Sequence, residues 1–130
     1  MQKLSLIAGI LLWVGWQGAQ APPPEVYLAG LSVSGGKVTI TNPVNISNNA
    51  AYDNQPAFTP DGAAVLFTSV RGDRQPDPKI AAATGSDIYR FDIAAGKLSQ
   101  LTTTNESEYS PTVTPDGRSF SVIQVEADGT

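Results

Sequence analysis

The sequence Pro-Ala-Phe-Thr-Pro-Asp-Gly at residues 56–62 returns, with small changes, as Pro-Thr-Val-Thr-Pro-Asp-Gly at residues 111–117. The match continues beyond the two copies, where Asp53 corresponds to Glu108 and Phe67 to Val122. Self-similarity at a fixed spacing is typical of folds built from supersecondary units that bury their apolar faces only by stacking on one another. The repeat therefore predicts a stacked, repetitive architecture.

Each copy predicts a tight turn between two strands. Proline fixes φ at the first central position of the turn, aspartate bonds the nearby backbone, and glycine accepts a positive φ. The strands expected from these turns and from runs of β-branched and aromatic residues span 56–59, 64–69, 87–93, 98–102, 111–114 and 119–125. The expected connecting loops include residues 48–54 and 103–108, and Asn42-Pro43 is expected to interrupt a strand.

A second correspondence extends the repeat toward the N-terminus. Val-Tyr-Leu at 26–28 resembles Ile-Tyr-Arg at 88–90, and Gly-Lys-Val at 36–38 resembles Gly-Lys-Leu at 96–98. The N-terminal segment thus corresponds to strands three and four of a unit, and the C-terminal segment to strands one and two. Tyr27 and Tyr89, as equivalent strand positions, are both expected to pack in the core or between units.

Four-stranded antiparallel units at this spacing predict an all-β protein, a partial β-propeller of four-stranded blades. Its parts are a half blade at 26–48, a full blade at 54–104 and a half blade at 109–130. A two-sheet sandwich or another all-β arrangement is the alternative, although a sandwich does not need a near-verbatim repeat. Because the two half units are complementary, we expect the chain to be an incomplete piece of a longer propeller.

The N-terminus has the layout of a secretory signal peptide, predicted at residues 1–21. A short positive start precedes an apolar run, which ends in the small-x-small sequence Ala-Gln-Ala at 19–21. The alternative, a membrane anchor, needs about 20 apolar residues, and this run is shorter. A stiff proline-rich spacer is expected at 22–25. With no cysteine to carry a lipid, the mature chain is predicted to be periplasmic or secreted, with neither a lipid anchor nor a membrane span.

Composition narrows the possible chemistry. The 130 residues carry a formal net charge of −4 and contain no cysteine and no histidine. These absences exclude disulfides, thiolate nucleophiles, Cys/His zinc sites and a Ser-His-Asp triad within the chain. The acidic balance argues against nucleic acid. We expect no catalytic, cofactor-binding or metal-binding residues here, and we assign structural roles to the aspartates of the repeated turns and strand starts: Asp61, Asp87, Asp92 and Asp116.

The polar segment 70–86 is the candidate binding loop, because it is longer than a typical hairpin connection and loops carry binding in such scaffolds. The alternative interpretation is that this segment is an insertion that the fold tolerates and that has no role in binding. The tripeptide Arg-Gly-Asp at 71–73 is too short to indicate adhesion by itself. The candidate binding residues form a mixed-charge set: Arg71, Asp73, Arg74, Asp77 and Lys79.

The repeat resembles that of the TolB-like β-propeller family, a WD-type propeller. The matching positions are Pro56, Phe58, Thr59-Pro60-Asp61-Gly62, the apolar strand 65–67, Asp87-Ile88-Tyr89 and Gly96; the second copy has Val113 in place of the aromatic residue. The resemblance implies a periplasmic protein of the cell envelope that binds partner proteins and needs no cofactor. We therefore expect an exported, soluble β-propeller that acts as a protein-binding scaffold. The alternative is the propeller of an exported hydrolase, a prolyl-oligopeptidase-type peptidase or an amidohydrolase, with its catalytic domain beyond Thr130.

Overall fold

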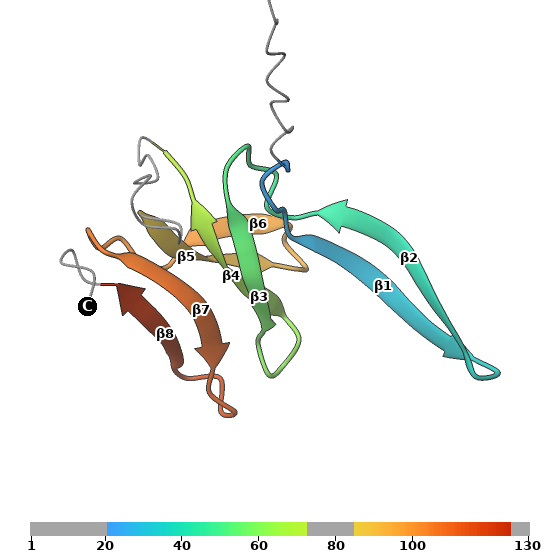
Figure 1. Ribbon diagram of the computed structural model, residues 1–130. Coiled ribbons are helices and arrows are strands. Elements are labelled where there is room, and N and C mark those ends of the chain that lie inside the picture. The colour runs from blue at the N-terminus through green and yellow to red at the C-terminus, as the bar shows by residue number, and fades with distance from the viewer. Residues whose placement is uncertain (1–20, 73–84, 126–130) are drawn as a thin grey trace, which may run out of the picture.

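The computed structural model describes residues 21–72 and 85–125, which contain eight β-strands and no helix (Figure 1). The protein is thus all-β over these ranges, as the sequence predicts. The strands are β1 (Tyr27–Ser34), β2 (Lys37–Asn45), β3 (Asp53–Phe58), β4 (Ala64–Val70), β5 (Ser86–Asp92), β6 (Lys97–Gln100), β7 (Ser107–Val113) and β8 (Phe120–Val125).

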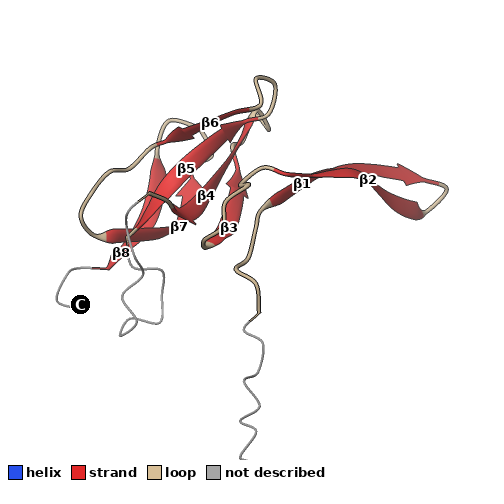
Figure 2. Ribbon diagram, turned by 90° about the horizontal axis from the view of Figure 1, so that it is seen from above, coloured by secondary structure: helices blue, strands red, loops and turns tan. Residues whose placement is uncertain are grey.

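The strands form three small antiparallel sheets, none of which closes on itself. β1 pairs with β2, β3 to β6 form one four-stranded sheet in sequence order, and β7 pairs with β8. The two-stranded sheets lie on opposite sides of the four-stranded sheet (Figures 1 and 2). The predicted division into blade pieces stays a prediction, as does the signal peptide, which apart from Ala21 lies outside the described residues.

The two copies of the repeat have the same strand register. Phe58 pairs with Val65 in the first copy, and Val113 pairs with Phe120 in the second. Both copies also contain a bulge immediately before their prolines, where Gln55 has φ of 55° and Ser110 has φ of 55°. The repeated sequence therefore specifies even an irregular feature of the backbone.

Bulges explain why two predicted strand starts and one predicted strand interruption were wrong. We expected strands to start at Pro56 and Pro111, but β3 and β7 begin earlier because the bulge lets pairing continue on the N-terminal side of each proline. The predicted loops 48–54 and 103–108 are correspondingly shorter. Asn42-Pro43 does not interrupt β2 either, because a register shift at this point and a positive φ at Asn42 accommodate the proline.

The main core lies between the four-stranded sheet and the base of the β1–β2 hairpin. Its buried members are Val26, Ile46, Val65, Phe67 and Tyr89. The Phe67 and Tyr89 rings are stacked with centroids 6.5 Å apart. Contacts of this kind bury apolar surface from strands far apart in sequence, which holds the hairpin base against the sheet.

Tyr27 does not share the burial of Tyr89. The side chain of Tyr27 is 61% exposed, whereas Tyr89 is 9% exposed, so the expectation of equivalent packing was wrong for Tyr27. The reason is that β5 lies between β4 and β6, while β1 pairs only with β2 among the described strands. The hairpin beyond its base extends away from the body of the protein (Figure 2).

β7 connects the second repeat to the first. It packs against β3, β4 and β5, whereas β1 and β2 have no comparable contact with any other described strand. The second repeat is therefore stacked against the four-stranded sheet. This stacking brings the turns of the two copies to the same end of the molecule.

Candidate functional site

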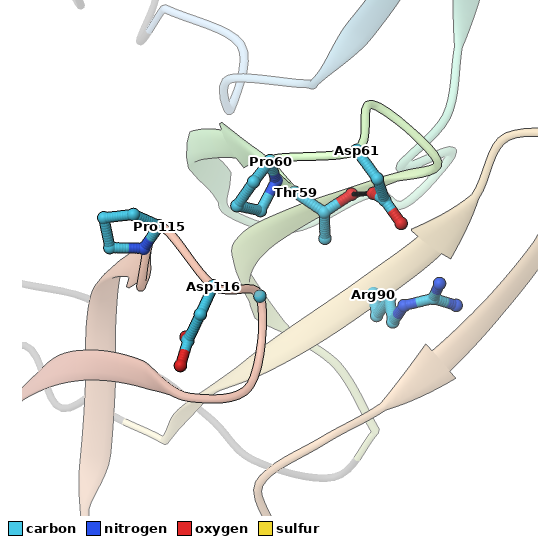
Figure 3. A pocket seen from close by; sticks show the side chains of 7 residues that line it. Thr59, Pro60, Asp61, Arg90, Pro115 and Asp116 are labelled. Atoms are coloured by element: carbon cyan, nitrogen blue, oxygen red, sulfur yellow. Dashed lines mark hydrogen bonds between the residues drawn. The ribbon is translucent and has the colours of Figure 1, made fainter.

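A cleft of about 510 Å³ opens between the two repeated Pro-Asp-Gly turns (Figure 3). One turn connects β3 to β4, the other connects β7 to β8, and Arg90 of β5 completes the lining. The residues that line it are Thr59, Pro60, Asp61, Arg90, Pro115, Asp116 and Gly117. The site therefore exists because two consecutive copies of one turn lie side by side.

Hydrogen bonds fix the same conformation in both turns. The hydroxyl of Thr59 donates to Oδ1 of Asp61 at 2.6 Å, and the backbone N–H of Ala63 donates to the same oxygen at 3.0 Å. In the second copy the hydroxyl of Thr114 donates to Oδ1 of Asp116, also at 2.6 Å. The predicted structural role of these aspartates is visible here. Because each bond uses Oδ1, the turn is held without using the other carboxylate oxygen.

The same hydrogen bonds lower the pKa of both carboxylates. The hydroxyl of Thr59 lowers the pKa of Asp61, and the hydroxyl of Thr114 lowers the pKa of Asp116, each with help from a backbone N–H. Arg90 brings a positive charge beside them and forms an ion pair with Asp92, with Nη1 and Oδ2 3.3 Å apart. The cleft thus presents both signs of charge.

The lining of this cleft combines charged side chains with apolar rings. It offers carboxylates, one guanidinium and two proline rings, and it contains neither histidine nor cysteine nor lysine. The Thr59 hydroxyl donates to Asp61, and this hydrogen bond holds the turn. In the described part of the chain, His, Cys, Asp and Glu side chains do not gather in a group of three that could hold a metal ion.

Of the predicted binding residues, the structure places only Arg71. Asp73, Arg74, Asp77 and Lys79 lie outside the described residues. Arg71 is engaged within the protein: its Nη2 is 3.4 Å from Oδ1 of Asp53, and its Nε donates to the hydroxyl of Ser69 at 2.8 Å. The guanidinium also lies over the Tyr89 ring, 5.2 Å from the centroid, and donates to the backbone carbonyl of Ser47. Its described contacts are therefore those of a structural residue.

Arg71 belongs to a buried polar network at the junction of the N-terminal segment and the four-stranded sheet. Asp53 is fully buried, and burial raises its pKa, although hydrogen bonds from Ser69 and Asn49 and the charge of Arg71 act in the opposite direction. The hydroxyl of Ser47 donates to Glu25 and lowers the pKa of that carboxyl. The network connects segments that are distant in sequence.

The same network recurs one repeat later. The backbone N–H of Val26 donates to the Ser47 hydroxyl at 2.9 Å, and that of Ile88 donates to the Thr102 hydroxyl at 2.9 Å. Glu108 takes the place of Asp53 and accepts hydrogen bonds from Thr102 and Thr104. Sequence reasoning missed this role, although the correspondence of Asp53 and Glu108 was the signal for it.

The cleft lies at one end of the sheet, and the first and last residues of the predicted loop lie at the other end. Ala64 and Asp92 pair at the end that carries the cleft (Figure 1). Val70 and Ser86 pair at the other end; both were predicted to belong to the loop, but they are the last residue of β4 and the first residue of β5. Sequence reasoning recognised the turns and missed the cleft, as well as Arg90. The available signal was that two copies of one polar turn come together when repeats stack.

No protein-family model matches this chain, and no curated protein matches it. Any functional conclusion therefore depends on the sequence, the fold and the cleft. Within residues 21–72 and 85–125, we find no helix whose length and apolar character would let it cross a membrane.

Proposed function

We propose that this chain is part of an exported β-propeller of the TolB-like type, which acts as a protein-binding scaffold in the cell envelope. The observation that carries the proposal is the cleft between two stacked copies of the same turn. A repeat scaffold that presents equivalent turns at one end forms a continuous surface of the kind used for protein contact. The exported location rests on the signal-peptide pattern at residues 1–21.

The chemistry of the cleft favours a polypeptide partner. Asp61 and Asp116 suit a lysine or arginine side chain, and Arg90 suits a carboxylate or backbone carbonyl. The rings of Pro60 and Pro115 add apolar contact between these charges. An exposed protein segment that carries a cation beside an acceptor group would satisfy all three features.

The test is an affinity pull-down from envelope extract of the source organism. Arg90→Ala removes the cleft cation, and Lys37→Ala removes a cation at the exposed tip of the β1–β2 hairpin as the matched control. A third variant with residues 72–84 shortened tests the predicted loop at the other end. We expect a partner that the unaltered chain and Lys37→Ala retain and that Arg90→Ala retains several-fold less.

The outcomes separate the competing proposals. Loss of the partner only when residues 72–84 are shortened would move the binding surface from the cleft to the loop. If all variants retain the same partners, neither the cleft nor the loop is the binding surface. Hydrolysis of peptide substrates, without recovery of any envelope protein, would refute the scaffold and favour the hydrolase alternative.

A further inference from the structure

Two carboxylates compete for Arg90, which is the only cation among the described residues that line the cleft. Nη1 of Arg90 lies 3.3 Å from Oδ2 of Asp92. Asp61 is also within reach of this charge: the Thr59 hydroxyl is the main cause of its lowered pKa, and Arg90 lowers this pKa further. Of these two described carboxylates, only that of Asp92 forms an ion pair with Arg90. The choice of partner decides which charges the cleft presents.

Asp92 is held in place by the turn that follows β5. Its Oδ1 accepts a 2.8 Å hydrogen bond from the backbone N–H of Ala95, and its Oδ2 accepts from Arg90. Arg90 and Asp92 are two residues apart on one strand, so their side chains project from the same face of the sheet. Asp92 therefore offers Arg90 an acceptor whose position is set by the turn and not by the cleft.

The backbone places Asp61 close to this ion pair. The N–H of Ile93 donates to the carbonyl of Ala63 at 3.0 Å, which joins the end of β5 to the turn that carries Asp61. Arg90 and Asp61 lie on one side of the cleft and Asp116 lies on the other (Figure 3). Without Asp92, the carboxylate of Asp61 would be the nearby alternative for the guanidinium.

We propose that Asp92 is a positioning residue of the cleft, which holds the Arg90 guanidinium away from Asp61 and so keeps the Asp61 carboxylate open to a cationic side chain of the partner. The inference rests on the proposed function, because it concerns the charges that the cleft offers to a polypeptide. If Arg90 paired with Asp61, the two charges would satisfy each other and the partner would lose both contacts. Arg90 pairs with Asp92 through one nitrogen, and a guanidinium has further N–H donors for an acceptor of the partner.

The first test follows the pKa of Asp61 by NMR titration of its side-chain carboxyl. Asp92→Asn keeps an oxygen for the Ala95 N–H and removes the charge that holds Arg90. We expect Arg90 to move to Asp61 and to lower its pKa, since a nearby cation favours the ionised carboxylate. Removing the negative charge of Asp92 also lowers this pKa directly. The same substitution in an Arg90→Gln chain measures the direct effect alone.

The second test measures binding of a defined probe, Nα-acetyl-lysine amide, which carries a cation beside backbone carbonyls. The backbone amide shifts of residues 59–62 and 115–117 report its binding to the cleft. We expect Asp92→Asn to bind the probe about two- to five-fold more weakly, the range that corresponds to an exposed ion pair. Asp92→Glu keeps a carboxylate and should lose less. In the Arg90→Gln chain, Asp92→Asn should change binding by less than it does when Arg90 is present.

The two tests separate this inference from the proposed function. A fall in the pKa of Asp61 that is the same with and without Arg90 would overturn the positioning role of Asp92. Failure of the unaltered chain to bind the probe would overturn the proposed role of the cleft, and with it the purpose assigned to Asp92. The pKa comparison would still decide where the Arg90 guanidinium lies, so the two failures are distinguishable.

Discussion

The backbone N–H of Ser110 donates a 3.0 Å hydrogen bond to the side-chain carbonyl of Gln55, its equivalent 55 positions earlier. Both residues have a positive φ and both precede the proline of their copy. The hydroxyl of Thr68 joins them, donating to Gln55 at 3.0 Å and accepting from Ser110 at 3.2 Å. The bulge of the first copy is thus hydrogen-bonded to the equivalent bulge of the second copy.

Gln55→Leu should destabilise the protein by about 1–3 kcal/mol, because the hydroxyl of Thr68 loses its acceptor and the N–H of Ser110 keeps only its bond to Thr68. Gln55→Glu keeps a side-chain oxygen at this position, so its free energy of unfolding should fall by less. Urea denaturation at neutral pH measures both. Equal losses for the two variants would show that the hydrogen bonds are not the cause.

Phe67→Ala should cost roughly 3–5 kcal/mol, because the ring is fully buried against Tyr89 and its removal leaves a cavity. Phe58→Ala is the matched control on the neighbouring strand β3, where the ring is 61% exposed. That substitution should change stability by less than about 0.5 kcal/mol. Chemical denaturation of both variants tests whether the core lies on the face of the sheet that carries Phe67 and Tyr89.

Arg71→Ala should destabilise the protein by about 3 kcal/mol at pH 7, because it leaves the buried Asp53 carboxylate without its cation. Without Arg71 the pKa of Asp53 rises further above that of the unfolded chain. A raised pKa in the folded state favours folding at low pH, so the deficit relative to the unaltered protein should shrink as pH falls.

Arg90→Ala is the control for Arg71→Ala. The Arg90–Asp92 pair is about one-third exposed on both side chains, and such surface pairs contribute about 0–1 kcal/mol. Parallel melting curves at pH 7 and pH 4 decide the comparison. A loss for Arg71→Ala that does not change with pH would mean that Asp53 is not the group responsible.

The aspartates of the turns contribute to stability with a pH dependence opposite to that of Asp53, because their pKa values are lowered and not raised. The pKa of Asp61 lies below its ordinary value of 3.8 because of the Thr59 hydroxyl, so the unfolded chain takes up its proton first as pH falls. The stabilisation is present above about pH 4 and is lost as pH falls through the folded-state pKa. The stability advantage over Asp61→Asn, measured from pH 6 to pH 2.5, should therefore disappear at the acid end. A constant advantage would contradict this assignment.

Sequence alone was sufficient to predict the all-β class, the Pro-Asp-Gly turns and the correspondence between the copies. These features are local: the proline, aspartate and glycine of each turn restrict the backbone themselves, and alternation along a strand depends on its own residues. Residues such as Asp61 and Asp116 could therefore be assigned structural roles before any contact was known.

Only the tertiary structure decided which equivalent residues are buried and which are accessible. Tyr27 and Tyr89 occupy the same position in the repeat, yet Tyr89 is covered by Phe67 while Tyr27 has no such neighbour in the described structure. Arg71, predicted for a binding surface, lies on Tyr89 and beside Asp53, and Arg90 lines a cleft that neither turn forms alone. Burial and site formation depend on partners distant in sequence, which a local pattern does not specify.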